Sequence, residues 1–125
     1  PDIIILDMGD KFATAGSERS DIYLKEAAIH ARNIAKKYNC VIIWMSQLSA
    51  EAEGKINVNQ SMLEGSKTGK AAEADLMLLL SKNPDIEGQD SNDPQRHIRL
   101  AKNKLTGWHG TVHVELDVET GRYSA

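Results

Sequence analysis

The sequence predicts an α/β domain in which a parallel sheet carries an antiparallel edge hairpin at its C-terminal end. The first observation is a series of short apolar runs bounded by turn-forming residues, at residues 3–6, 41–45 and 76–80. Runs of this length are typical of strands that are buried on both faces of a parallel sheet. The second observation is a helical pattern between the first two runs, and the third is an alternation of apolar and polar residues after His97. Such alternation is typical of strands with one face in water.

Length and composition limit the classes of protein that fit. A chain of 125 residues matches one domain of common size, and 41% hydrophobic with 26% charged residues is ordinary for a soluble protein. The net charge of −3 excludes an overall basic field, so a nucleic-acid contact needs a local patch. The single cysteine, Cys40, precedes an apolar run, which predicts a buried thiol in a reducing, intracellular setting. No apolar run approaches the roughly 18 residues of a membrane helix, so no membrane partner is expected.

The first strand, residues 3–6, runs directly into Asp7. In open α/β sheets, ligands bind at the carboxyl ends of the strands. An apolar strand that ends in Asp is how nucleotide hydrolases present a Walker B carboxylate to Mg²⁺, although a solvated Asp at the end of a core strand fits equally well. Asp10 follows shortly after, and the two carboxylates could share a metal ion; the alternative is that Asp10 is simply solvated.

A helix from Ser20 or Asp21 to Tyr38, closed by Asn39, leads to the second strand. Its apolar positions recur at spacings of three and four residues: Leu24, Ala27, Ala28, Ala31, Ile34, Ala35 and Tyr38. A strand, helix and strand in succession form a right-handed crossover, so the two strands should be parallel and close together. The second strand ends in Ser46-Gln47, which places Gln47 at the same edge as Asp7. A glutamine there could hydrogen-bond a phosphate or an attacking water, or merely cap the strand.

Residues 48–69 show no sustained apolar period, and a long irregular stretch in a domain is usually functional. The sequence from Gly65 to Ala71 resembles a P-loop but lacks its spacing and has Ala71 in place of the hydroxyl residue. We interpret it as a loop whose Lys67 and Lys70 contact the phosphates of a nucleic acid strand. A solvated turn is the alternative.

The C-terminal third is expected to form the antiparallel edge. After a third buried strand at residues 76–80 comes a polar surface loop, 82–95, and then a strand at 97–104 with Lys102 and Lys104 on the same side as Ile98 and Leu100. A strand at 111–118 and a short one at 122–123 complete it. The four histidines have no common metal-binding spacing and are interpreted as surface or turn residues.

Together these features resemble a known family, the RecA-like motor domain of DnaB-type hexameric replicative DNA helicases, especially bacteriophage primase-helicases. The resemblance is carried, in order, by Ile4–Asp7, Ser46-Gln47, Glu64–Ser66 through Ala74–Leu76, Ala101–Gly107 and Glu119–Gly121. It implies a RecA-like P-loop NTPase core in which residues 1–125 are the C-terminal part of a single ATPase domain that lacks Walker A. The abrupt start at Pro1-Asp2 also leads us to expect a piece of a longer polypeptide, inactive by itself.

The resemblance also implies roles for individual residues. Asp7 would support Mg²⁺ on ATP or another NTP, and Gln47 would sense the γ-phosphate and couple it to a DNA-binding loop. Lys104, where the family commonly has an arginine finger, would reach the nucleotide of a neighbouring subunit, and Lys102 could share that role, because a lysine cannot grip a phosphate bidentately. The residues implied to contact single-stranded DNA are Ser66, Lys67 and Lys70. The implied assembly is a hexameric ring in the cytoplasm of a bacterial or phage-infected cell.

Three alternatives remain open at this point. A recombinase or clock-type ATPase of the same fold would share Asp7 and Gln47. A metal-dependent nuclease would use Asp7 and Asp10, with Glu64 and Asp75 as further candidate ligands. The third alternative is a non-catalytic DNA-binding or adaptor domain.

Overall fold

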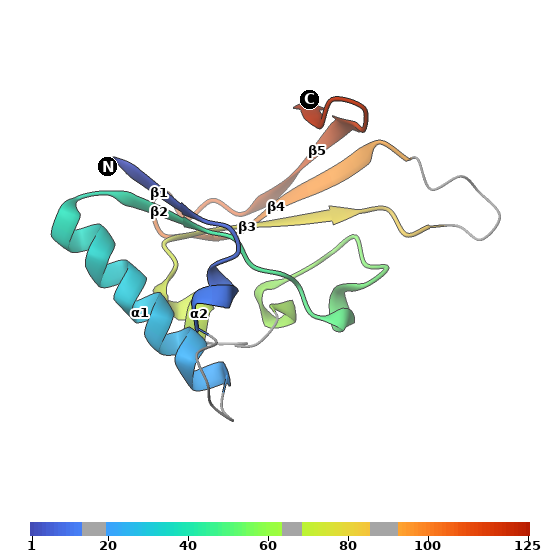
Figure 1. Ribbon diagram of the computed structural model, residues 1–125. Helices are drawn as coiled ribbons and strands as arrows, with labels where there is room; N and C mark the ends of the chain where they lie inside the picture. The colour runs from blue at the N-terminus through green and yellow to red at the C-terminus, as the bar shows by residue number, and fades with distance from the viewer. Residues whose placement is uncertain (14–19, 64–68, 86–92) are drawn as a thin grey trace. The chain divides into compact units, whose positions relative to one another are not determined.

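The computed structural model describes residues 1–13, 20–63, 69–85 and 93–125 (Figure 1). The chain folds as two units. The first comprises Pro1–Ser49 with Ser61–Ala74, and the second comprises Ala50–Gln60 with Asp75–Ala125. Among the described residues, no helix is both long and apolar enough to cross a membrane.

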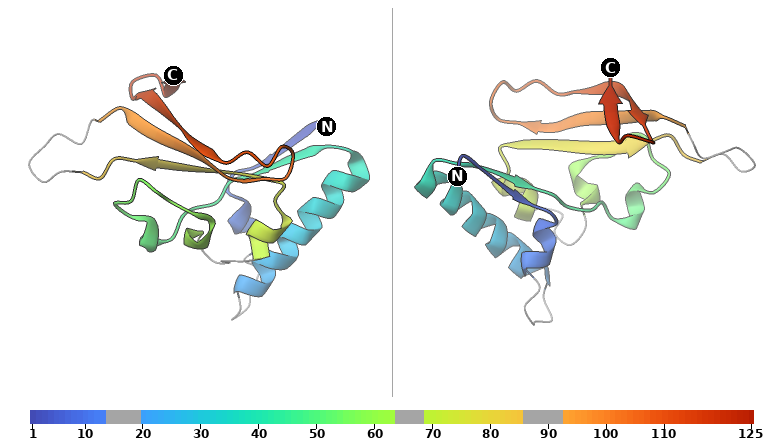
Figure 2. Two further views of the ribbon diagram at one scale, coloured as in Figure 1. Left: turned by 180° about the vertical axis from the view of Figure 1, so that it is seen from behind. Right: turned by 45° about the horizontal axis from the view of Figure 1, so that its top comes forward.

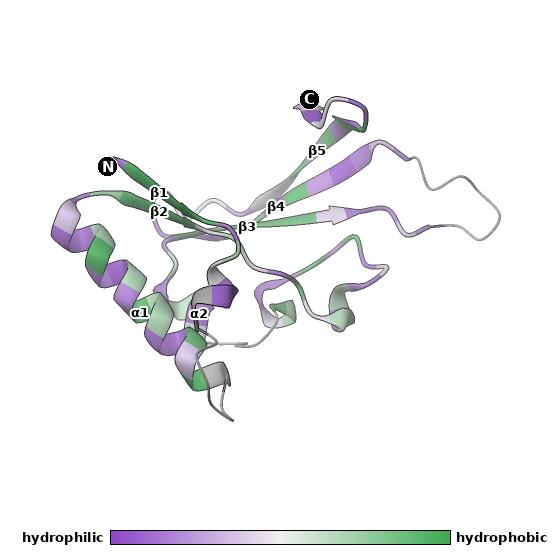
Figure 3. Ribbon diagram, in the orientation of Figure 1, coloured by the Kyte–Doolittle hydropathy of each residue, from purple (hydrophilic) through white to green (hydrophobic). Residues whose placement is uncertain are grey.

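The first unit is built on two parallel strands, β1 (Ile3–Leu6) and β2 (Val41–Trp44), joined by helix α1 (Ser20–Tyr38). Ile3 pairs with Val41 and Leu6 with Trp44, so the predicted parallel pairing is confirmed. Figure 3 shows both strands as strongly apolar. The expectation of burial on both faces is wrong for this chain, because one face is exposed on alternate residues: Ile3, Ile5, Val41 and Ile43.

Helix α1 has the predicted bounds. Leu24 and Ala28 are buried, whereas Tyr38, expected on the apolar face, is exposed in the last turn. Asn39 ends the helix with a φ of 49°, a left-handed conformation that Asn tolerates well, and the thiol of Cys40 is buried and free as expected. The short helix α2 (Gly69–Glu73) packs against α1, as the two views in Figure 2 show.

The second unit is a four-stranded antiparallel sheet in the order β3-β4-β5-β6. Its strands are β3 (Leu76–Lys82), β4 (Gln95–Asn103), β5 (Gly110–Asp117) and β6 (Arg122–Ser124). This corrects the expectation that the third apolar run joins the parallel strands. No crossover helix separates β3 from β4, and consecutive strands without one pair antiparallel. Only alternate residues of β3 are covered, so Leu79 is 4% exposed and Leu78 is 55% exposed.

A β-bulge changes the side of the sheet on which Lys102 lies. Leu78 pairs with Leu100 but Met77 pairs with Lys102, which leaves Ala101 as the extra residue of β4. Because side chains alternate along a strand, one extra residue moves those that follow it to the opposite face. The prediction that Lys102 shares a side with Ile98 and Leu100 is therefore wrong.

His97 also departs from expectation, since it is only 6% exposed rather than a surface residue. Its Nδ1 lies 2.7 Å from Nδ1 of His113 on β5, and its Nε2 lies 2.8 Å from Oδ1 of Asn83. The remaining part of this unit, residues 50–60, contains a 3₁₀ turn at Ala50–Ala52 and the well-buried Val58. The Ser81 hydroxyl donates to the carbonyl of Ile56 at 2.7 Å and ties this segment to β3.

Candidate functional site

Asp7 and Gln47 follow the carboxyl ends of the two parallel strands, as predicted. Two backbone bonds hold these ends together: Met45 N–H donates to the carbonyl of Leu6 at 3.1 Å, and Gly9 N–H donates to the carbonyl of Met45 at 3.0 Å. The side chains of Asp7 and Gln47 are both exposed. Within the described part of the chain, neither has a hydrogen-bond or ion-pair partner. Both are therefore available to a ligand at this edge.

The donor atoms at this edge suit Mg²⁺ carried by a nucleotide. In residues 1–13, 20–63, 69–85 and 93–125, no group of three or more His, Cys, Asp or Glu side chains could enclose a metal ion. Mg²⁺ in nucleotide sites does not need such a cage, because phosphates and waters supply most of its ligands beside one or two carboxylates. A single exposed carboxylate, Asp7, meets that requirement.

A buried ion pair lies beside this edge, between Asp10 and Lys70. The ammonium of Lys70 donates to both carboxylate oxygens of Asp10, at 2.9 and 3.0 Å, and to Oγ of Ser46 at 2.7 Å. The Ser46 hydroxyl donates to Asp10 Oδ2 at 2.6 Å, and Trp44 Nε1–H donates to Asp10 Oδ1 at 3.0 Å. Lys70 is 7% exposed and Asp10 is 17% exposed. We call Asp10, Trp44, Ser46 and Lys70 the Asp10 cluster.

The Asp10 cluster stabilises the charged carboxylate. Burial raises the pKa of Asp10, but hydrogen bonds from Ser46, Lys70 and Trp44 and the charge of Lys70 outweigh it, so the pKa lies below its usual value. Gly9 makes the approach of Trp44 possible, because a Cβ on Gly9 would lie 2.3 Å from the indole ring. The 3₁₀ helix Gly9–Ala13 thus carries Asp10 to the indole N–H.

These contacts change the interpretation of two predicted site residues. Asp10 was a candidate metal ligand beside Asp7, but both of its oxygens are engaged by Lys70. Lys70 was expected to contact a DNA phosphate, and to do so it would have to leave a buried ion pair. Ser66 and Lys67 lie outside the described residues. Sequence reasoning gave no role to Trp44 and missed the partnership of residues 10 and 70, which are far apart in the chain.

Lys102 and Lys104 belong to the second unit, at the end of β4. Lys104 N–H donates to the carbonyl of Asp75 at 2.9 Å, and its ammonium lies 3.5 Å from Asp75 Oδ1, with the two side chains 44% and 55% exposed. Asn103 shapes the following turn, because its Oδ1 accepts from the backbone N–H groups of Leu105 and Thr106 at 3.0 and 3.1 Å. Lys104 is thus held on a defined turn with its ammonium near the surface.

Comparisons with known proteins show which folds this chain resembles. The sequence matches no protein-family model and no protein of curated function. Among solved structures, one described as an ATPase domain matches with a TM-score of 0.74 and 19% identity, over 89% of this chain. Another, a DnaB-like replicative helicase studied with its interactions with primase, matches with a TM-score of 0.79 and 19% identity, over 97% of this chain.

The chain shares its fold with a part of each of these two solved structures. The predicted α/β class is confirmed, with the correction that four of its strands form an antiparallel sheet. The chain spans 39% and 30% of the lengths of these two solved chains. The likeness therefore concerns a part of each solved chain, and it covers both units described above.

Proposed function

We propose that this chain is the C-terminal part of the RecA-like motor domain of a DnaB-type hexameric replicative helicase, which hydrolyses ATP or another NTP to translocate on single-stranded DNA. The observation that carries the proposal is the placement of Asp7 and Gln47, both exposed, at the adjacent carboxyl ends of β1 and β2. The fold likeness over nearly the whole chain supports it. Such a protein would work in the cytoplasm of a bacterial or phage-infected cell.

Asp7 and Gln47 take different roles at the nucleotide. Asp7 would hold the Mg²⁺ of the bound nucleotide, and that ion supplies charge stabilisation for phosphoryl transfer. Gln47 carries no charge, so it would contact the nucleotide by hydrogen bonds rather than by charge attraction. These hydrogen bonds would form when the γ-phosphate is present and be lost when it leaves. A backbone hydrogen bond between Met45 and Leu6 links the two strand ends. A shift of Asp7 would therefore displace Gln47, and a shift of Gln47 would displace Asp7.

The remaining contacts of the motor would come from the other predicted residues. Ser66 and Lys67 would contact single-stranded DNA in the central channel. Lys104, assisted by Lys102, would reach the nucleotide bound by the neighbouring subunit of the ring. The rest of the motor domain, including Walker A, would come from a longer polypeptide. The exposed apolar faces of β1 and β3 support this, because a folded domain normally covers such surfaces.

Two substitutions in the full-length protein test the proposal. Asp7→Asn should lower NTP turnover roughly a hundredfold or more, since metal-assisted charge stabilisation is worth several kcal/mol. Gln47→Ala should reduce the stimulation of turnover by single-stranded DNA more than turnover without DNA. Asp2→Asn is the matched control, because this exposed carboxylate precedes the same strand at its opposite end.

The same assays separate the alternatives. Full NTP turnover in Asp7→Asn would exclude the proposed role of Asp7 in holding the Mg²⁺ of the bound nucleotide. A recombinase or clock-type ATPase would hydrolyse NTP without separating the strands of a forked DNA duplex. A nuclease would cleave the DNA; against it, within the described residues, Asp10 and Asp75 both pair with lysines.

A further inference from the structure

The ammonium of Lys70 lies among three oxygen atoms beside the carboxyl edge of β1 and β2. It is 2.9 and 3.0 Å from the two carboxylate oxygens of Asp10 and 2.7 Å from Oγ of Ser46. The Ser46 hydroxyl donates its own hydrogen to Asp10 Oδ2, which leaves its lone pairs to accept from the ammonium. Carboxylate and hydroxyl oxygens are also donors that a hard cation such as Mg²⁺ takes in proteins. Lys70 therefore occupies a position whose oxygen atoms would suit a metal ion.

Burial makes a cation at this position necessary. Lys70 is buried and Asp10 is largely buried. A carboxylate removed from water stays ionised only where hydrogen bonds or a nearby positive charge compensate for its lost hydration. The indole of Trp44 and the hydroxyl of Ser46 each donate one hydrogen bond to Asp10, but both groups are neutral. The positive charge comes from Lys70, which both donates hydrogen bonds to Asp10 and lowers its pKa by charge attraction.

The two carboxylates that follow β1 differ in this respect. Asp7 is exposed and, within the described part of the chain, has no hydrogen-bond or ion-pair partner. Asp10 is paired with a cation that belongs to the chain itself, so the pairing does not depend on the concentration of a metal ion. A single exposed carboxylate holds Mg²⁺ only weakly, and the phosphates of a nucleotide normally supply further ligands. Asp7 is thus the carboxylate of this pair that remains open to a metal ion.

We propose that Lys70 is a built-in counter-ion that holds the cation position of Asp10, so that this edge takes a divalent metal ion through Asp7 alone and only together with a nucleotide. Removal of the ammonium should open Asp10 to a metal ion in the absence of nucleotide. The inference rests on the proposed function in one respect, the assignment of Asp7 to the Mg²⁺ of the nucleotide. Lys70 acts through Asp10, which makes it a positioning residue and not a catalytic one.

Trp44 makes metal binding at Asp10 directly observable. Its Nε1 lies 3.0 Å from Asp10 Oδ1, so a metal ion bound to that carboxylate would be close to the indole ring. Tb³⁺ is a hard, oxygen-binding cation that emits light when a neighbouring indole transfers excitation energy to it. The chain has two tryptophans, so Trp108→Phe leaves Trp44 as the only energy donor in these residues. The test titrates Tb³⁺, without nucleotide, into the full-length protein with this substitution and with phenylalanine at any tryptophan outside residues 1–125.

Lys70→Met should bind Tb³⁺ at least about tenfold more tightly than the protein that keeps Lys70, because a cation a few ångströms away repels a metal ion strongly at a partly buried site. Mg²⁺ should displace the bound Tb³⁺, which shows that the site accepts the physiological cation. Lys70→Arg keeps the positive charge and should not gain the site. The double variant Lys70→Met with Asp10→Asn should lose the gain, because the charged oxygen ligands are then absent.

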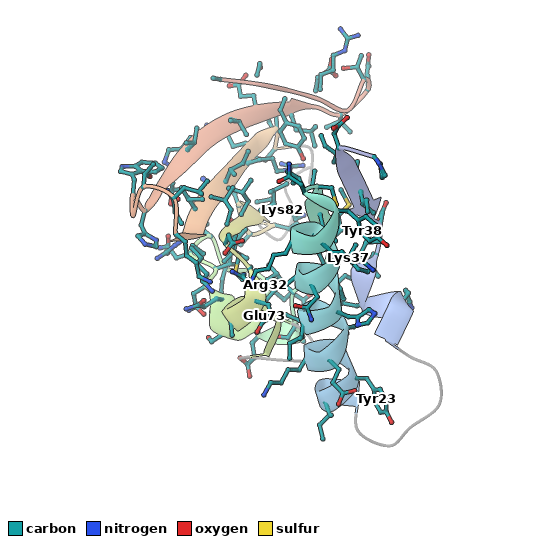
Figure 4. All side chains as sticks on the ribbon, turned by 90° about the vertical axis from the view of Figure 1, so that its left-hand side faces the viewer. Tyr23, Arg32, Lys37, Tyr38, Glu73 and Lys82 are labelled. Carbon is teal, nitrogen blue, oxygen red and sulfur yellow. The ribbon has the colours of Figure 1, made fainter. Side chains whose placement is uncertain are left out.

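A second ion pair on α2 provides the matched control. Arg32 of α1 donates to the carbonyl of Glu73, and its Nε lies 3.9 Å from Glu73 Oε2 (Figure 4). Arg32→Met therefore also removes a cation from a carboxylate of the first unit, but it leaves the pair of Asp10 and Lys70 intact. Its Tb³⁺ emission should stay at the level of the unsubstituted protein. A gain of emission in Lys70→Met then reflects the opening of Asp10 and not a general loss of positive charge.

The outcomes separate this inference from the function on which it rests. Unchanged Tb³⁺ affinity in Lys70→Met, an equal gain in Arg32→Met, or a gain that persists with Asp10→Asn would each overturn the inference. If Lys70→Met does not fold without metal, circular dichroism decides instead: recovery of the helical signal with Mg²⁺ but not with Na⁺ supports the inference, and no recovery overturns it. Failure of the proposed function appears elsewhere, as full NTP turnover in Asp7→Asn, and does not affect these nucleotide-free measurements.

Discussion

Replacing Lys70 by methionine measures how far the first unit depends on its buried ion pair. The substitution keeps most of the side-chain volume but removes the ammonium that donates to both oxygens of Asp10 and to Ser46. Removing one partner of a buried pair costs roughly 3–5 kcal/mol, because the remaining charge stays buried without compensation. Asp10 keeps its bonds from Trp44 and Ser46. We therefore expect the lower end of that range, about 3 kcal/mol.

Thermal unfolding of the chain at pH 7, followed by circular dichroism, gives the measurement. For a chain of this size about 1 kcal/mol corresponds to about 4 °C, so Lys70→Met should lower the Tm by roughly 12 °C. Glu73→Gln is the control: its charge contact spans 3.9 Å and both side chains are over a quarter exposed, so its loss should cost about 1 kcal/mol or less. A Tm for Lys70→Met no lower than that of Glu73→Gln would refute the importance of the buried pair.

Two further predictions concern the Asp10 cluster. Folding lowers the pKa of Asp10. Its contribution to stability should therefore be complete above the unfolded-state pKa of about 3.9 and disappear as the pH falls through the lower folded-state pKa. In urea unfolding at several pH values, the difference in stability between the unsubstituted chain and Asp10→Asn should shrink below about pH 4. Gly9→Ala should destabilise by roughly 1–3 kcal/mol because the new Cβ would overlap the Trp44 ring; unchanged stability with unchanged Trp44 emission would contradict the packing.

The elements that sequence reasoning found best are those determined by local patterns. The period of apolar residues gave α1 its bounds, and Asn39 marked its end because Asn accepts the left-handed conformation found there. The pairing of β1 with β2 followed from the helical crossover between them. The edge positions of Asp7 and Gln47 followed in turn, because parallel strands end on the same side.

The features that sequence reasoning missed depend on contacts between distant residues. The apolar run of β3 gave no indication that only one of its faces would be covered, because that depends on which other strands it pairs with. The extra residue at Ala101 in β4 carries no turn-forming signal, so the change of face at Lys102 was invisible in the alternation. Lys70 looked like a loop cation because its partner, Asp10, lies far away in the sequence.

The role of Lys104 can be decided because its two interpretations differ greatly in magnitude. As a partner of Asp75 it forms an exposed ion pair at 3.5 Å, which is worth at most about 1 kcal/mol. As a residue that reaches the nucleotide of an adjacent subunit, it would neutralise charge that develops on the transferred phosphoryl group, where an arginine finger is worth roughly 10³ to 10⁵ in rate. Lys104→Ala in the full-length protein should then abolish hydrolysis, whereas Asp75→Asn, which breaks the ion pair but keeps Lys104 itself, should leave it nearly unchanged.

Mixing subunits shows whether Lys104 acts across an interface. A Lys104→Ala subunit keeps its own nucleotide pocket, and a subunit with a defective Walker A lysine keeps its Lys104. When the two inactive proteins are combined with single-stranded DNA, some interfaces pair an intact pocket with an intact lysine, so part of the turnover should return. Full turnover in Lys104→Ala alone would exclude any catalytic role. A loss that no mixture restores would mean that the lysine acts within its own subunit, because only a residue shared between subunits can be supplied by a neighbour.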